Sequence, residues 1–484
     1  MAGWFVQAAR PLTFDEMQQS KLLELLRHLD KRQLNRVSEA VESPFFNKNG
    51  DIARLFQYLI RFAPTFNQPE LGKTMVLNNL ELSKPLDERR LQYMMSDLVT
   101  LIEDVLALDR IEMDVPTRLL ALAKTLAETG LSERAQHALA RLEDYWEKNE
   151  SQSPERLLLE FSAARMVFEL TDRTRRVFDP ALQKASDQLS VFFLVEKLRF
   201  QTAMANHEQM LEIQYRHDLR EEEIEIWAAK SIHPLVQLWL LIYRITRYDK
   251  LEDFISLKQI LTSEAKHMAK ADLGNLTQFA LNFCTRRINL DANERFYVEY
   301  LDLYKLLISN DLILENGQIS PWIYKNIVTA GLKTNDLPWT REFIENFRPH
   351  LPEDFAESMY AYNLGHLFYH EKKYKDAQQA LAKVEFRDPL MSVSARSLLI
   401  KIYVETDQDD LLFAALEAAR VWLLRNQAVT AGLRQQFQKF VEMTGKMARL
   451  LPKDRAGAVL LLEKLPPPTE VLHRDWLAVQ LKKW

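Results

Sequence analysis

The hydrophobic positions of this chain recur at the spacing of an amphipathic helix over most of its length. Between 87 and 108, apolar side chains follow one another at i, i+3, i+4 and i+7, which places them on one face of a helix. They are Leu91, Met94, Met95, Leu98, Leu101, Ile102, Val105 and Leu106. Further helices are predicted at 31–42, 51–62, 70–82, 155–170, 179–203, 207–229, 233–245, 250–268, 272–288 and 292–309. The pattern therefore predicts an all-α protein.

The region near the N-terminus contains a helix-start signal and a turn. Thr13 and Glu16 have the spacing of a capping box, in which each side chain accepts a hydrogen bond from the other's backbone N–H. Pro44 ends the second helix of the chain. We expect the two aromatic residues that follow it, Phe45 and Phe46, to pack inward.

Two segments of 34 residues follow the same internal pattern of large and small residues. In 358–391 the pattern comprises Leu364, Gly365, Phe368, Tyr374, Ala377, Leu381, Val384 and Pro389. In 116–149 it comprises Leu122, Ala123, Leu126, Ala135, Leu139 and Leu142. Small residues at two of these positions allow two antiparallel helices to approach closely. We therefore expect Gly365 to face Ala377, and Gly130 to form the turn of the earlier hairpin.

This pattern resembles the tetratricopeptide repeat, although Ala361 stands where that family often has Trp. A backward shift of 35 residues superposes Ala330 on Gly365 and Trp339 on Tyr374. A forward shift of 35 residues superposes Tyr403 on Phe368, Leu412 on Ala377 and Leu416 on Leu381. The resemblance implies an α-solenoid of stacked helix hairpins, and the layout is similar to that of bacterial repeat proteins.

The pattern divides the chain into four segments. We expect an N-terminal helical domain at 1–112, a degenerate repeat region at 113–320, repeats that resemble tetratricopeptide units at 321–468 and a capping helix at 469–484. A terminal cap is needed because the last repeat of a solenoid has no neighbour to cover its apolar face.

Composition supports the helical interpretation and narrows the cellular setting. Glycine contributes 11 of 484 residues, whereas ~7% is usual. The single cysteine, Cys284, excludes an intramolecular disulfide. The chain begins without a secretory signal, and its longest apolar stretch is shorter than the ~18 residues of a membrane span. We therefore expect a cytoplasmic protein that is not in a membrane. The net charge of −5 makes nucleic acid an unlikely partner.

Three local motifs resemble functional sites but lack essential parts. The segment Gly72–Thr74 matches the end of a phosphate-binding loop, but Asn67 occupies the position of its first glycine. His366 and His370 have the spacing of a metal-chelating pair, but no third ligand lies near them in sequence. Cys284 precedes two arginines, which can lower a thiol pKa, yet it is typical of a buried helix cysteine. We therefore expect no enzyme, no cofactor and no metal.

The resemblance also implies a partner-binding groove, lined by the first helix of each unit. The residues that it assigns to the groove are Tyr362, Asn363, His366, Tyr369, His370, Lys401 and Glu405, with Met359 beside them. Asn363 and Lys401 are similar to residues with which some family members clamp the terminal carboxylate of a peptide. The alternative is that these side chains pack against the chain's own neighbouring helices.

Three functions are compatible with these features. The absence of a catalytic motif favours a non-catalytic scaffold that binds a protein or peptide partner in the groove. The runner-up is a regulator whose N-terminal domain contains a nucleic-acid-binding helix-turn-helix and whose repeats act as a sensor. Its phosphate contacts would be Lys73, Lys84, Arg89 and Arg90. The third is an enzyme whose site is assembled from distant turns. The oligomeric state is left open.

Overall fold

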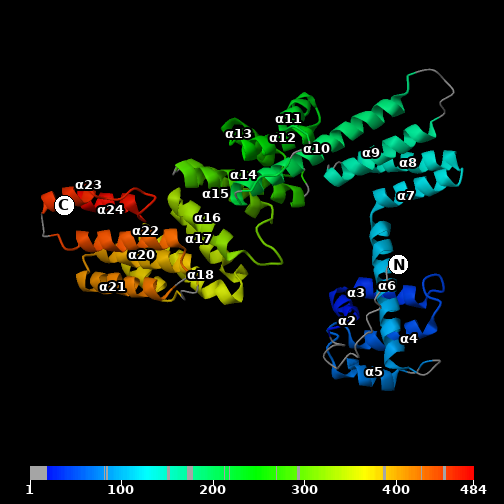
Figure 1. Cartoon of the computed structure of the whole chain (residues 1–484), viewed down its shortest axis with the longest axis horizontal. Coiled ribbons are helices and arrows are strands. Elements are labelled where there is room, and N and C mark those ends of the chain that lie inside the picture. Colours follow the sequence, from blue (N-terminus) through cyan, green and yellow to red (C-terminus); the bar gives the residue numbers. More distant parts are fainter. Residues whose placement is uncertain are drawn as a thin grey trace, which may run out of the picture. The chain divides into compact units, whose positions relative to one another are not determined.

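The computed structural model of the chain is all-α, as the sequence predicts (Figure 1). It describes residues 19–80, 82, 86–149, 153–171, 178–211, 213–216, 219–266, 268, 270–291, 295–384, 388–426, 428–450 and 454–483. Within these ranges it contains 23 α-helices and no β-strand. The chain divides into two compact units, 1–193 and 194–484. The finer subdivision at 112/113, 320/321 and 468/469 stays a prediction.

The helices follow one another with short connections. The N-terminal unit contains α2 (Lys21–His28), α3 (Lys31–Glu42), α4 (Gly50–Leu59), α5 (Lys73–Asn79), α6 (Glu88–Met113), α7 (Val115–Glu128), α8 (Ser132–Lys148) and α9 (Pro154–Leu170), and α10 (Pro180–Leu211) contains the boundary. The C-terminal unit contains α11 (Glu221–Lys230), α12 (Pro234–Arg247), α13 (Leu251–Ser263), α14 (Lys270–Asp291), α15 (Arg295–Ser309), α16 (Pro321–Lys333), α17 (Leu337–Phe347), α18 (Glu353–His370), α19 (Tyr374–Leu381), α20 (Pro389–Glu405), α21 (Asp409–Arg425), α22 (Ala431–Met447), α23 (Arg455–Glu463) and α24 (Arg474–Lys482). The 3-10 helices are η1 (Ile60–Phe62), η2 (Pro69–Leu71) and η3 (Arg348–His350).

The first helices of the chain pack around α6, which contacts α2, α3 and α4. Their apolar faces share one hydrophobic cluster, to which α2 contributes Leu23, α3 contributes Val37, α4 contributes Phe56 and α6 contributes Leu98. α6 carries the apolar period predicted for 87–108 and continues to Met113. The regular spacing of its apolar residues is what lets one helix serve as the centre of this bundle.

The turn after α3 differs from the expectation. Phe45 is 84% exposed and Phe46 is 41% exposed. The Ser43 carbonyl accepts hydrogen bonds from the backbone N–H groups of Phe46 and Asn47, so the turn closes on itself and leaves both rings toward solvent. The prediction that these rings pack inward is wrong. The capping box expected at Thr13–Glu16 lies outside the described residues.

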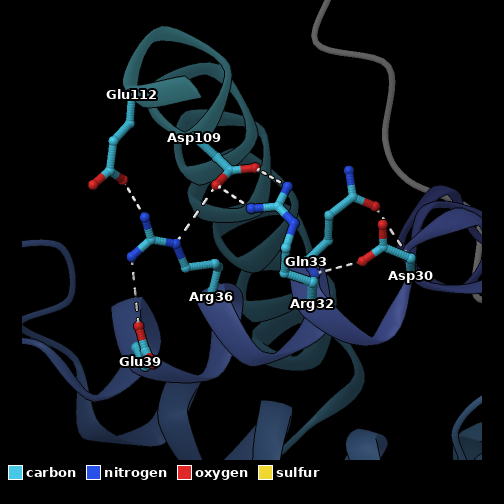
Figure 2. A network of polar contacts seen from close by, with 7 residues as sticks. All are labelled: Asp30, Arg32, Gln33, Arg36, Glu39, Asp109 and Glu112. Carbon is cyan, nitrogen blue, oxygen red and sulfur yellow. Dashed lines mark hydrogen bonds and ion pairs between the residues drawn. The ribbon is translucent and has the colours of Figure 1, made fainter. Parts of the chain in front are cut away.

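An ion-pair network joins α3 to the C-terminal part of α6 (Figure 2). Arg32 donates two hydrogen bonds to Asp109, at 2.9 and 2.6 Å. Arg36 lies 3.5 Å from Asp109 and also pairs with Glu112 and Glu39. The hydrogen bonds from Arg32 outweigh the burial of the Asp109 carboxylate, so the pKa of this carboxyl lies below its usual range. The network fixes the register of α3 on α6.

α7 and α8 form a hairpin of the kind that the 34-residue pattern predicts. Ala123 and Ala135 are fully buried. Leu139 and Leu142 belong to the hydrophobic cluster that fills the hairpin. Gly130 has a φ of +80° in the turn, a conformation that favours glycine. The close approach of the two helices and the turn at Gly130 are therefore confirmed.

The middle of the chain contains one departure from the expected helices. α10 continues to Leu211, and α11 begins only at Glu221, where the sequence predicts a single helix over 207–229. Three acidic residues, starting with Glu221, occupy the first turn of α11. Carboxylates are stabilised there by the positive end of the helix dipole. The acidic run therefore begins a helix, and the prediction of one continuous helix is wrong.

Three consecutive hairpins follow residue 320: α16–α17, α18–α19 and α20–α21. The first helices contact one another directly, α16 with α18 and α18 with α20. Within the middle hairpin, a Cβ atom placed on Gly365 would lie 2.8 Å from Leu381 Cγ and 3.6 Å from the Ala377 carbonyl oxygen. The expected contact between Gly365 and Ala377 is therefore confirmed, and only glycine allows it without displacing Leu381.

The spacing of these hairpins confirms one of the two repeat shifts. α18 and α20 end at His370 and Glu405, and α19 and α21 begin at Tyr374 and Asp409, so both pairs are 35 residues apart. α17 begins at Leu337, which is 37 residues before Tyr374. The backward shift of 35 is therefore wrong by two residues. The 3-10 helix η3 lies between α17 and α18 and lengthens this connection.

The same turn recurs in several hairpins. The residue two positions before the second helix has a φ between 51° and 80° in five of them, at Gly130, Asp249, Asn335, Lys372 and Asp407. In α18–α19, the N–H of Lys373 donates to the Phe368 carbonyl and that of Lys372 to the Tyr369 carbonyl. This is the Schellman arrangement, which satisfies the last carbonyls of the first helix and starts the return of the chain.

α24 packs on the helices that precede it. Leu477 and Leu481 are buried in one cluster with Phe437 and Phe440 of α22. α24 contacts α22 and α23 and starts at Arg474, five residues after the start expected at 469. Its apolar face therefore covers the helices at this end of the C-terminal unit.

Candidate functional site

Two of the residues assigned to a groove are directed into the protein. Tyr362 and Asn363 are 3% and 1% exposed. The Asn363 side-chain amide donates a 2.8 Å hydrogen bond to the Met359 carbonyl one turn earlier. The Tyr362 hydroxyl lies 2.7 Å from Ser394 Oγ of α20. Both side chains therefore join the chain's own helices.

Glu405, at the end of α20, accepts three hydrogen bonds from other elements. The donors are the Tyr369 hydroxyl at 2.6 Å, the Tyr374 hydroxyl at 2.7 Å and the Trp476 indole N–H at 2.6 Å. Burial by itself would raise the pKa of the carboxyl, but the three donors hold it below its usual range. The carboxylate therefore links α18, α19, α20 and α24. Its negative charge is stabilised by hydrogen-bond donors of the chain itself.

The three remaining predicted residues belong to a group of six basic side chains, which we name the basic cluster. It comprises Lys325 and Lys333 of α16, His366 and His370 of α18, Lys401 of α20 and His473 at the N-terminus of α24. Each member interacts electrostatically with at least one other. Lys333 and His370 are exposed and the other four are half-buried. The contacts between successive first helices bring these residues together.

Crowding of like charges and partial burial disfavour the protonated forms in this cluster. Burial lowers the pKa of Lys401 to about 8, and Lys333 contributes, against the opposing effect of Glu405. Burial lowers the pKa of His366 to about 3, with further contributions from Lys401, His370 and Lys325. A cation that is removed from water without an opposite charge is costly.

Two lysines of the cluster lack a nearby carboxylate in the part of the chain that the structure describes. Among the described residues, no carboxylate oxygen lies within the 4.0 Å ion-pair distance of Lys325 or Lys401. The Lys401 ammonium lies instead over the Trp476 ring, 5.7 Å from its centroid. Asp388 and Glu405 act on Lys325 and Lys401 only from a greater distance. The cluster can therefore bind an anion, which would supply the missing counter-charge.

His366 and Ser394 do not form an activated nucleophile pair. His366 Nε2 lies 3.5 Å from Ser394 Oγ, while the Tyr362 hydroxyl is closer to that oxygen at 2.7 Å. An imidazole with a pKa of about 3 is also a weak base. Ser394 Oγ is therefore hydrogen-bonded to the Tyr362 hydroxyl, which is the closer partner.

The other candidate residues that the sequence suggested form contacts within the chain or are buried. Lys73 of the Gly72–Thr74 segment forms an ion pair with Glu88 and is buried. Arg90 pairs with Asp51. Cys284 is buried, which raises the pKa of its thiol and makes it unreactive.

No group of three His, Cys, Asp or Glu side chains in the described ranges is placed to hold a metal ion. No helix of the described chain combines the length and apolar character needed to cross a membrane.

Sequence reasoning missed half of the basic cluster and the Trp476 donor to Glu405. Lys325, Lys333 and His473 lie outside the 34-residue unit that carried the pattern. Trp476 is separated from Glu405 by 71 residues. No periodic signal connects such residues, because α24 is not a repeat of α20. His366, His370 and Lys401 were found from the repeat register.

Comparison with protein-family models, with curated proteins and with solved structures finds no match for this chain. The interpretation of the site therefore depends on its own geometry.

Proposed function

We propose that this protein is a non-catalytic interaction scaffold that binds a protein or peptide partner on the first-helix face of α16, α18 and α20. The single observation that carries the proposal is the basic cluster. Two of its lysines, Lys325 and Lys401, are half-buried and have no carboxylate within ion-pair distance among the described residues. A protein that needed this face only for packing would gain stability by replacing such lysines with apolar residues.

The proposal includes a tetratricopeptide-like solenoid in a cytoplasmic, bacterial protein. Support for the repeat comes from the sequential contacts between hairpins, the 35-residue spacing from α18–α19 to α20–α21 and the recurrent Schellman turn. In such an array each first helix extends the same face, and an elongated partner can contact several units at once.

Site-specific photo-crosslinking in the native cell tests this function. A photoreactive residue replaces His370, which is exposed in the basic cluster, and in a matched variant it replaces Gln379, which is exposed on the second helix α19. We expect the His370 position to capture a defined partner and the Gln379 position not to capture it. Capture of the same proteins from both positions, or from Gln379 alone, would contradict the proposal.

The alternative function, a regulator that binds nucleic acid through its N-terminal domain, has less support. Of its four proposed phosphate contacts, Lys73 and Arg90 are paired with carboxylates and Arg89 bonds the Tyr93 hydroxyl. Lys84 lies outside the described residues. Phosphate binding would have to break these pairs. If the full chain shifted a nucleic acid in a gel and the shift weakened with salt, this alternative would be supported.

A further inference from the structure

We propose that the basic cluster binds an internal acidic segment of a partner protein, a stretch of consecutive Asp or Glu residues, and not a peptide terminus. This inference rests on the proposed function and names the chemistry of the partner. The members of the cluster come from four helices, α16, α18, α20 and α24, so an extended segment that crosses these helices meets several cations in succession.

Charge complementarity identifies the partner as anionic. Lys325 and Lys401 are half-buried and have no carboxylate within ion-pair distance in the described structure. Lys333 and His370 lie at the exposed side of the same group. An incoming carboxylate would first meet the exposed members and would then pair with the half-buried ones. Pairing recovers the free energy that each half-buried cation loses when it leaves water.

The position of Asn363 argues against recognition of a peptide terminus. A terminal carboxylate is held best by convergent N–H donors together with a cation. The Asn363 amide is buried and already donates to the Met359 carbonyl. Asn363 is therefore not available to a terminal carboxylate, and the lysines and histidines of the cluster suit side-chain carboxylates.

The distribution of charge favours a protein over a nucleic acid. Nucleic-acid binding requires an extended row of exposed Lys and Arg that follows the phosphate backbone. The basic cluster contains no Arg, and only Lys333 and His370 of its members are exposed. Glu353 and Asp354 are exposed at the N-terminal end of α18, and Asp407 is exposed after α20. These acidic residues would repel a long polyanion.

Binding is coupled to proton uptake. Lys401 is faced by Glu405 on its own helix, Lys333 on α16, His366 on α18 and His473 before α24. In the free protein the pKa of Lys401 is about 8, and a bound carboxylate raises the pKa of Lys401 and of the neighbouring imidazoles. Affinity is therefore highest near neutral pH, where the partner's carboxylates are ionised and Lys401 is protonated, and it falls as pH rises above 8.

Fluorescence anisotropy with a labelled oligoglutamate peptide, acetylated and amidated at its ends, tests the proposal on the full chain. We expect binding that weakens with salt and that weakens roughly tenfold between pH 7 and pH 9.5 as one charge is lost. The double variant Lys325→Gln/Lys401→Gln should lose most of the affinity. The matched control Lys375→Gln/Lys383→Gln removes two exposed lysines of α19 and its C-terminal end, outside the cluster, and should bind like the wild type.

Thermal melting by circular dichroism checks that each variant is folded. If the half-buried pair fails to fold, Lys333→Gln/His370→Gln replaces two exposed members and should also weaken binding. The inference is overturned if oligoglutamate does not bind, if oligoglutamine binds equally, or if the control double variant loses as much affinity. Tighter binding of a single-stranded oligothymidine of equal charge would overturn it in favour of a nucleic acid.

The two proposals fail in distinguishable ways. If the crosslinker at position 370 captures a partner while oligoglutamate does not bind and the Lys325→Gln/Lys401→Gln variant still captures that partner, only the acidic-segment inference is lost. If position 370 captures no partner either, the proposed function is lost as well.

Discussion

Glu405 shows how one side chain can look like a ligand-binding group in the sequence and serve the fold instead. A half-buried carboxylate needs hydrogen-bond donors, and Tyr369, Tyr374 and Trp476 supply three. The same contacts attach α24 to α18 and α20. The negative charge that would repel an acidic partner is thus surrounded by donors of the chain itself, and Lys401 is left one turn away.

Removing the indole donor to Glu405 should lower stability. Trp476→Phe keeps an aromatic ring but deletes the N–H, and two donors to the carboxylate remain. We expect the free energy of unfolding to fall by about 1–2 kcal/mol, measured by urea denaturation. Trp322→Phe, at an exposed position of α16, is the matched control and should change little. Equal stability of both variants would mean that the Trp476 hydrogen bond is not formed.

Replacing Lys401 with Met should stabilise the folded protein near neutral pH. The pKa of Lys401 is depressed from 10.5 to about 8 by burial, so the unfolded chain binds this proton more tightly and the charged side chain destabilises the fold below pH 8. Since the side chain is only partly buried, we expect a gain of about 1–3 kcal/mol at pH 7.

The pH dependence of this gain gives a second check. Wild-type stability rises between pH 8 and 10.5 as folded Lys401 loses its proton, so the advantage of Met should shrink over that interval and disappear above it. Urea denaturation at several pH values measures the difference in free energy of unfolding between the variant and the wild type. Lys375→Met serves as the exposed control. A gain that does not depend on pH would show that packing, and not charge, causes it.

The helix ends of this protein are harder to predict from the sequence than the helix interiors. The interior of α6 follows the apolar period that the sequence predicts. The turns are less regular in sequence, because the left-handed position of the Schellman turn holds Gly, Asn, Asp or Lys in different hairpins. Gly130 is identified as a turn from its residue type, because glycine favours a positive φ. The variety of residue types at turns is why the boundaries between 207 and 229, and the two-residue error in the backward shift, were not visible in the sequence.

Two glycine substitutions separate helix propensity from helix packing. In Gly365→Ala, the new Cβ would lie 2.8 Å from Cγ of the buried Leu381, and we expect destabilisation by about 1–3 kcal/mol. In Gly274→Ala, within α14, the new Cβ meets no atom within 4 Å, so the better helix propensity of Ala should stabilise by up to ~1 kcal/mol. Opposite shifts in melting temperature are the expected result, and stabilisation by both would contradict the close contact between α18 and α19.

At the scale of the whole molecule, stability is distributed over several hydrophobic clusters. One lies within 22–105, another within 119–163, and two more fill the C-terminal unit, the last of which contains α22 and α24. A chain built in this way is stabilised by contacts between neighbouring helices, as in repeat proteins. Deletion of a terminal helix should therefore destabilise the hydrophobic cluster next to it before the other clusters.

The C-terminal helix should be required for the last cluster. Leu477→Ala removes a buried side chain that packs with Phe437 and Phe440, and should cost about 2–5 kcal/mol. Val479→Ala, on the exposed side of the same helix, should stay within about 0.5 kcal/mol of the wild type. Deletion of 469–484 should expose the cluster and cause aggregation, measured by light scattering. A truncated protein that stays monomeric and equally stable would contradict the role of α24 as a cap.

The sequence by itself determined the all-α class, the positions of most helices and the close contact of Gly365 with Ala377. These depend on the period of apolar residues and on side-chain size, which are local properties. Only the tertiary structure decided which groups meet. It directed Asn363 inward, joined Glu405 to Trp476 across 71 residues and brought Lys325, Lys401 and His473 together from three helices. Contacts of this kind depend on how helices are placed against one another, and no spacing along the chain encodes that placement.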